Sequence, residues 1–202
     1  MNLQAVKKLC LAAARFEIID APNGNQWLGD GWSMYAVDGY RVTETAVPAL
    51  FDLTAKQIAN STIREGESTA PIFAAREGFP GERPLKEIGM IYSEGDLFLA
   101  LADAEGTGAM LLISAAALKP LKKDEDYRRY YLREKGAHSA VAVYGDLMCD
   151  ALITPLAQAT AAMVMMTAAA AARLTLWMPE DLESMAEGAK QIIAEAMHVE
   201  GE

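Results

Sequence analysis

The chain has 202 residues, 52% of them hydrophobic, and a formal net charge of −10 at pH 7. This length suits one domain, or one domain with an appendage, and it allows the chain to bury roughly 70% of its unfolded surface. The acidic balance excludes indiscriminate binding to nucleic acid or to an anionic membrane, because like charges repel.

Two cysteines, Cys10 and Cys149, are present. They cannot build a disulfide framework or a paired Cys-x-x-Cys zinc site, so we expect a reducing compartment. The first fifteen residues do not have the order of a signal peptide, because Lys7 and Lys8 fall inside the apolar run. We therefore expect a soluble, cytoplasmic protein.

Hydrophobic spacing predicts an opening helix at residues 2–15, with Asn2 as a favourable N-cap and Leu3, Val6 and Cys10 on one face. A second helix is expected at 47–60. Between and after these helices, Gly, Pro and Asp turn signals separate short strands. The strands are expected at 16–20, 26–37 (interrupted at 29–31), 62–65, 72–75, 88–92 and 97–102.

The second half predicts a buried strand at 109–113, a helix at 114–123 that contains Pro120, and strands at 127–133, 140–144 and 151–154. The basic residues of the region 128–135 are mixed with the acids at 124–126 and 134, which predicts a solvated strand face with cross-strand charge pairs. This basic set is Arg128, Arg129, Arg133 and Lys135.

The C-terminal part has a different character. Residues 156–174 are rich in Ala and Met and predict a helix, and Pro179 opens another, with an acidic face opposite an apolar stripe. The stripe consists of Leu182, Met185, Ala189, Ile192 and Met197. Residues 151–179 are long enough to cross a bilayer, but their Ala and Thr content is a weak insertion signal. We expect a buried, close-packed helix there and no membrane span.

No catalytic pattern emerges from the polar residues. His138 and His198 have no Cys or acid at metal-ligand spacing. Asp30 and Asp38 each stand beside a glycine, which favours turn roles over a pair of catalytic carboxylates. We expect a protein that is not an enzyme and has no cofactor or metal.

Two segments carry a family resemblance. In residues 32–42 an alternating strand pattern leads into Asp38, Gly39, Tyr40 and Arg41. This resembles the Ala-Thr-Asp-Gly-x-Arg-Leu signature of bacterial DNA sliding clamps, with valines at positions 37 and 42. Residues 140–155, which end in Ala-Leu-Ile-Thr-Pro, resemble the closing hairpin of clamp domains. The resemblance spans residues 1–157. It departs from the family in Pro120, in the lack of an opening strand, and in residues 158–202.

The resemblance implies an α+β fold, with antiparallel sheets and two packed helices in a clamp-like domain, 1–157. The apolar pattern of the C-terminal part, which the resemblance does not cover, predicts a helical hairpin at 158–202. The resemblance also implies that the two helices face the backbone of duplex DNA without sequence specificity. Six basic residues, a third of the 18 in the chain, lie on these helices. They are Lys7, Lys8, Arg15, Lys119, Lys122 and Lys123. Solvated helix faces are the alternative interpretation.

The expected function is that of a noncatalytic, sliding-clamp-like protein associated with DNA replication, or a scaffold. The alternative is an assembly protein that has the same fold, does not bind DNA, and uses the C-terminal stripe as its partner surface. A small-molecule enzyme of unrecognised type is a third class, since fold does not dictate function. One clamp-like domain cannot surround a duplex, and an apolar stripe of this size needs a cover, so we expect a homo-oligomer.

Overall fold

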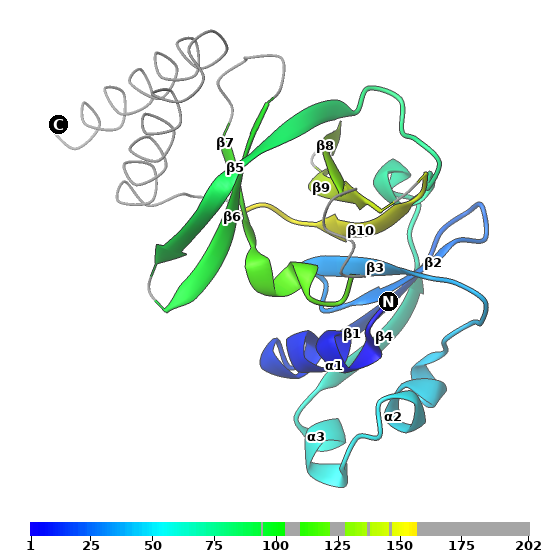
Figure 1. Ribbon diagram of the computed structural model, residues 1–202. Coiled ribbons are helices and arrows are strands. Elements are labelled where there is room, and N and C mark those ends of the chain that lie inside the picture. Colours follow the sequence, from blue (N-terminus) through cyan, green and yellow to red (C-terminus); the bar gives the residue numbers. More distant parts are fainter. Residues whose placement is uncertain (94, 104–109, 122–127, 137, 146, 157–202) are drawn as a thin grey trace, which may run out of the picture. The chain divides into compact units, whose positions relative to one another are not determined.

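The computed structural model describes residues 1–93, 95–103, 110–121, 128–136, 138–145 and 147–156 (Figure 1). The described part is mainly β, with ten strands in a mixed sheet and few helices. The chain divides into two compact units. Unit 1 contains Met1–Glu82 and Ala116–Thr154, and unit 2 contains Arg83–Ala115 and the segment that begins at Pro155. Among the described residues, no helix is both long enough and apolar enough to cross a membrane.

The strands of unit 1 lie in the order β4-β1-β2-β3-β10-β9-β8. Neighbouring strands are antiparallel except β1 and β4, which are parallel. The strands are β1 (Arg15–Asp20), β2 (Gln26–Gly29), β3 (Ser33–Val37), β4 (Thr62–Glu67), β8 (Arg129–Lys135), β9 (His138–Tyr144) and β10 (Cys149–Ile153). Most of the predicted strands are confirmed, including the division of residues 26–37 at the Gly-Asp-Gly turn. The parallel pairing of β1 with β4 departs from the expected antiparallel sheet.

Helix α1 (Leu3–Ala12) packs on one face of this sheet (Figure 1). The side chain of Asn2 caps it by accepting hydrogen bonds from the backbone N–H groups of Gln4 and Ala5, as the sequence predicts. Val6 and Cys10 are its buried residues. The helix ends three residues before the expected position 15, because the chain turns at positive φ and enters β1.

The predicted helix at residues 47–60 is two short helices instead, α2 (Val47–Leu50) and α3 (Ala55–Ala59), and the 3-10 turn η1 (Glu44–Ala46) precedes them. Asp52, at φ +47°, interrupts the helical path, and Thr54 starts α3 with a capping box closed by Gln57. Phe51 packs against Phe16 of β1 with ring centroids 5.3 Å apart, which holds these turns against the sheet.

The helix expected at residues 114–123 is wrong beyond a single 3-10 turn, η3 (Ala115–Leu118). Pro120 has no N–H to continue a helix and clashes with the preceding turn. The carbonyl of Pro120 instead accepts a hydrogen bond from Asn2 N at 2.6 Å, and the carbonyl of Ala117 accepts one from Tyr35 Oη at 2.7 Å. The segment thus reaches α1, but as a turn and not as a second packed helix.

The opposite face of the unit 1 sheet buries an apolar cluster that includes Trp27, Met34, Ala142 and Leu152. Residues 68–82, which we call the strap, pack against it. The strap contains η2 (Pro71–Phe73), so the strand expected at 72–75 is wrong. The ring of Phe73 meets Trp27 edge-on at 6.1 Å between centroids.

Unit 2 contains an antiparallel set in the order β5-β6-β7. The strands are β5 (Arg83–Ser93), β6 (Asp96–Asp103) and β7 (Met110–Ser114), and β5 starts earlier than the sequence predicts. Ile91, Ala100 and Leu112 form a buried cluster on one face. On the other face, Tyr92 and Leu97 are opposite each other in register and are exposed.

The turn between β2 and β3 generates a stability prediction. A Cβ atom on Gly29 would lie 1.8 Å from the carbonyl oxygen of Ser33, so the backbone would have to shift. Gly29→Ala is therefore expected to lower the free energy of unfolding by about 1–3 kcal/mol, as overpacking does. Urea denaturation followed by circular dichroism measures this.

Gly66→Ala is the matched control, because nothing lies within 4 Å of its added Cβ and Gly66 is exposed on β4. Its effect should stay within about 0.5 kcal/mol. Equal urea midpoints for the two variants would contradict the described turn.

Candidate functional site

A buried polar cluster of unit 1 surrounds Arg133, whose relative exposure is 0%. Its Nε pairs with Glu82 Oε1, and its Nη2 donates a hydrogen bond to Tyr144 Oη at 2.7 Å. Tyr144 Oη donates in turn to Glu82 Oε1 at 2.8 Å. Desolvation by burial and the hydrogen bond to Glu82 raise the pKa of Tyr144 to about 12, so this hydroxyl stays protonated at neutral pH.

The same guanidinium holds the strap. Nη1 of Arg133 donates to the carbonyl oxygens of Ile72 and Ala75, both at 2.8 Å. The two carbonyls between them accept hydrogen bonds from side chains of β2 and of the β1–β2 turn. Trp27 Nε1 donates to Phe73 O at 3.0 Å, and Asn23 donates to Ala74 O. Four consecutive strap carbonyls therefore have side-chain donors, which replaces the ladder of a strand and explains why no strand forms here.

A second buried arginine, Arg76, joins the strap to the end of the sheet. It forms an ion pair with Asp38, and its Nε donates to Cys149 O at 3.1 Å. Asp150 lies 3.7 Å from the same guanidinium. Burial raises the pKa of Asp150, with the charge of Arg76 acting in the opposite direction and that of Asp38 reinforcing the rise.

The two cysteines are buried, and the pKa values of their thiols lie far above neutral pH. Burial raises the pKa of Cys10, and it raises the pKa of Cys149 to about 12. A thiol in this state is inert at neutral pH. Within the described residues, no group of three or more His, Cys, Asp or Glu side chains is placed to hold a metal ion.

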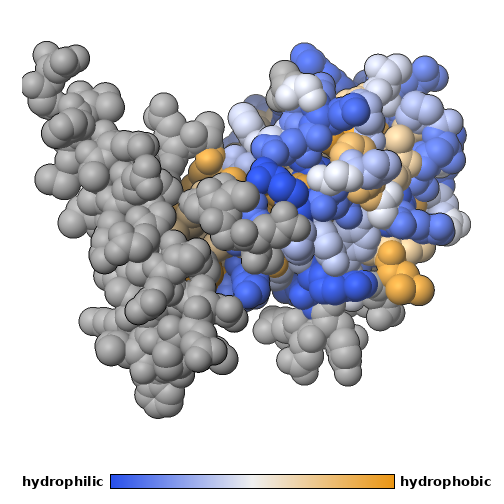
Figure 2. All heavy atoms as spheres, turned by 90° about the horizontal axis from the view of Figure 1, so that it is seen from above, coloured by the Kyte–Doolittle hydropathy of each residue, from blue (hydrophilic) through white to orange (hydrophobic). Residues whose placement is uncertain are grey.

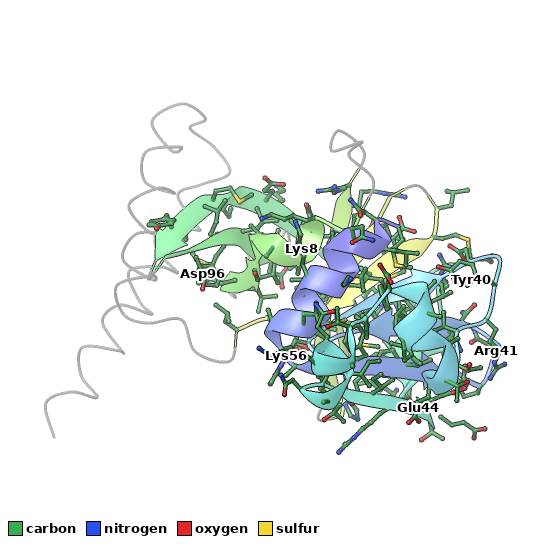
Figure 3. All side chains as sticks on the ribbon, turned by 90° about the horizontal axis from the view of Figure 1, so that it is seen from below. Lys8, Tyr40, Arg41, Glu44, Lys56 and Asp96 are labelled. Atoms are coloured by element: carbon green, nitrogen blue, oxygen red, sulfur yellow. The ribbon has the colours of Figure 1, made fainter. Side chains whose placement is uncertain are left out.

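The predicted DNA-binding residues have different fates. Lys8 on α1 and Lys119 after η3 are exposed, and Figure 3 shows Lys8 on the outer side of α1. Lys7 donates to Asp52 O at 3.0 Å, and Arg15 is paired with Glu17 at 2.6 Å.

Lys122 and Lys123 lie outside the described residues, as do all members of the predicted interaction stripe: Leu182, Met185, Ala189, Ile192 and Met197. The predicted C-terminal hairpin and the division at residue 157 therefore stay predictions.

The motif Asp38-Gly39-Tyr40-Arg41 lies in the loop after β3, where Figure 3 shows Tyr40, Arg41 and Glu44. Asp38 pairs with Arg76, Gly39 has φ +81°, and Arg41 pairs with Asp20 at 2.7 Å. The turn role predicted for Asp30 is confirmed, because its Oδ1 accepts hydrogen bonds from the N–H groups of Trp32 and Ser33.

Sequence reasoning missed the buried arginines. The prediction of a solvated charged face is wrong for Arg133, which β8 directs into the apolar cluster of the strap face. A partial signal existed: the neighbouring strand β9 is apolar at most positions, which indicates that this region of the sheet is buried. No such local signal marks Arg76 or Glu82.

No family model, curated protein or solved structure matches the chain.

The Arg133–Glu82 pair generates a stability prediction. Arg133→Met leaves the carboxylate of Glu82 buried without its partner and removes the donors to two strap carbonyls. The free energy of unfolding is expected to fall by about 3–5 kcal/mol. Adding Glu82→Gln should recover part of this loss, because the unpaired charge is removed. Denaturant titration of the single and double variants measures both effects.

Arg41→Met is the control for this experiment. Its side chain is 66% exposed, and Asp20 keeps the hydrogen bond from Gln26 without it, so the substitution should cost no more than about 1 kcal/mol. A loss for Arg133→Met as small as this would contradict a central role for the buried pair.

Proposed function

We propose that this chain is a noncatalytic assembly protein, which binds other protein chains. The observation that carries this proposal is that the reactive groups are buried and engaged within the fold. Arg133 forms hydrogen bonds to the strap, and the strap residues Glu82 and Arg76 form ion pairs. Both thiols are buried and have raised pKa values. Large apolar side chains, in contrast, are presented to solvent. They include Trp32 and Leu147, which are 64% and 81% exposed.

A clamp-like architecture is the finer part of this proposal. It is supported by α1 lying on the sheet, by the bond from Asn2 to Pro120, and by the antiparallel β9–β10 hairpin at the chain position where clamp domains close. The reduction of the second helix to η3 weighs against it. The C-terminal stripe from Leu182 to Met197 is proposed as a further partner surface.

The assembly proposal predicts a mass above that of one chain, 21.8 kDa, when the protein is concentrated. Light scattering over a wide concentration range measures this mass. The physical reason is that burying the exposed Trp32 and Leu147 side chains in a partner removes apolar surface from water. A mass of one chain at every concentration would overturn self-assembly.

Duplex DNA is a second candidate partner, favoured by one observation. Helix α1 contains two lysines and no acid, and the bond between Asn2 and Pro120 brings exposed Lys119 to its start. This candidate predicts weak duplex binding at low salt, which falls steeply as salt rises and shows little sequence preference.

Lys8→Glu combined with Lys119→Glu should then abolish binding in a fluorescence anisotropy titration, while Lys56→Glu on α3 serves as an equally exposed control. Figure 3 shows Lys56 apart from Lys8. If the unmodified protein does not bind at low salt, the DNA candidate fails and assembly with protein remains.

A further inference from the structure

The β2–β3 turn presents Trp32 on a fixed backbone. The N–H of Trp32 donates to Asp30 Oδ1 at 2.9 Å, and its carbonyl oxygen accepts from Thr154 N at 2.7 Å. Its side chain is nevertheless 64% exposed. Such an anchor loses little conformational freedom when it binds, and Trp is the residue type most enriched among interface hot spots.

A cation lies beside this turn. A Cβ atom on Gly31 would be 3.1 Å from Cζ of Arg15, so the guanidinium is next to the residue that precedes Trp32. The Arg15 side chain is 44% exposed and also contacts Glu17. We call Trp32 and Arg15 the Trp32 end of unit 1.

The other end of strand β3 has the opposite character. Asp38 follows β3, while Leu147, Met148 and Asp150 come from the β9–β10 turn and the start of β10. Arg76 bonds the carbonyl of Cys149 and contacts both carboxylates, which brings the two segments together. Leu147 and Met148 are 81% and 37% exposed. We call Leu147, Met148, Asp38 and Asp150 the Leu147 end.

The Leu147 end has two partly exposed carboxylates for one buried arginine, with Asp38 70% and Asp150 45% exposed at the side chain. It therefore offers unbalanced negative charge next to apolar side chains. The Trp32 end offers an exposed apolar side chain and the guanidinium of Arg15, which is 44% exposed while the Glu17 side chain paired with it is 14% exposed. The more exposed charge thus has the opposite sign at the two ends, which favours attraction and fixes orientation.

We propose that the Trp32 end of one copy docks on the Leu147 end of a second copy, with Trp32 against Leu147 and Met148 and with Arg15 facing Asp38 and Asp150. The proposal deepens the proposed assembly function and rests on it. The two ends are separated by strand β3, about 17 Å for five residues, so one chain cannot close the contact on itself. The contact is head-to-tail, and each copy has one end of each kind.

The side of the molecule drawn in Figure 2 favours an interface made of a few small apolar anchors and not of one broad apolar face. In the view of Figure 2, hydrophilic residues dominate the described surface and hydrophobic residues form small separate groups. An interface of this type depends on a few buried anchors and weakens with salt, because part of its attraction is between charges.

Two full-length variants test the contact by complementation. Trp32→Ala disables the Trp32 end, and Leu147→Asp disables the Leu147 end. Each variant alone should fall to the mass of one chain in light scattering, 21.8 kDa. An equimolar mixture retains one working end of each kind, so it should reach twice this mass and no more. The unmodified protein should lose mass as salt is raised.

Tyr92→Ala is the matched control, since it removes an aromatic side chain of similar exposure, 66%, from unit 2. It should keep the unmodified mass. Thermal melts by circular dichroism check folding, and Trp32→Gln and Leu147→Gln replace the first pair if a melt is lowered.

Three results would overturn the contact while leaving assembly intact. The first is unmodified mass in both single variants, and the second is an equal fall for Tyr92→Ala. The third is a mixture that stays at one chain, which would indicate a symmetric interface. A fall in mass only for Ile192→Asp would likewise place the interface on the C-terminal stripe. A one-chain mass for the unmodified protein would overturn both the contact and self-assembly, and the proposed function would then be limited to binding chains of another kind.

Discussion

The charged guanidinium of Arg133 is fully buried, and the surrounding part of unit 1 supplies hydrogen-bond acceptors for it. Desolvating a guanidinium costs several kcal/mol unless every donor finds an acceptor. Glu82, Tyr144 and two strap carbonyls supply those acceptors. The strap must therefore keep its irregular path, because a strand would turn these carbonyls toward a neighbouring backbone. In turn, the strap covers Trp27 and the apolar cluster of its sheet face.

This constraint bears on function. A charged group that holds a fold together cannot also exchange protons or bind ligands freely, since any change in its state costs stability. The described groups with the most strongly shifted pKa values, Tyr35, Cys10, Cys149 and Tyr144, are all buried in this way. Perturbed pKa values also occur in structural networks, and here the geometry favours that explanation.

Local signals predicted much of the fold. Asn2 set the start of α1, and the Gly-Asp-Gly turn divided β2 from β3. The failures share a physical cause, because each depends on contacts between segments distant in sequence. The apolar run 72–75 has the composition of a strand, but Arg133, 61 residues away from Ile72, fixes it as a strap. Likewise, nothing near β4 predicts its parallel pairing with β1. Lys8 and Lys119 of the candidate site are exposed as expected, whereas the burial of Arg133 was not foreseen.

The Asp38–Gly39 motif shows why a short sequence signature is weak evidence for function. Asp38 pairs with Arg76, Gly39 adopts the left-handed conformation, and Arg41 pairs with Asp20. Each residue has a structural task in this fold, so the motif is explained without any clamp-like activity. Trp32 is different, because its turn depends on Asp30 and two glycines while the Trp32 side chain is left 64% exposed. Information about partners is therefore to be sought in side chains whose exposure the fold does not require.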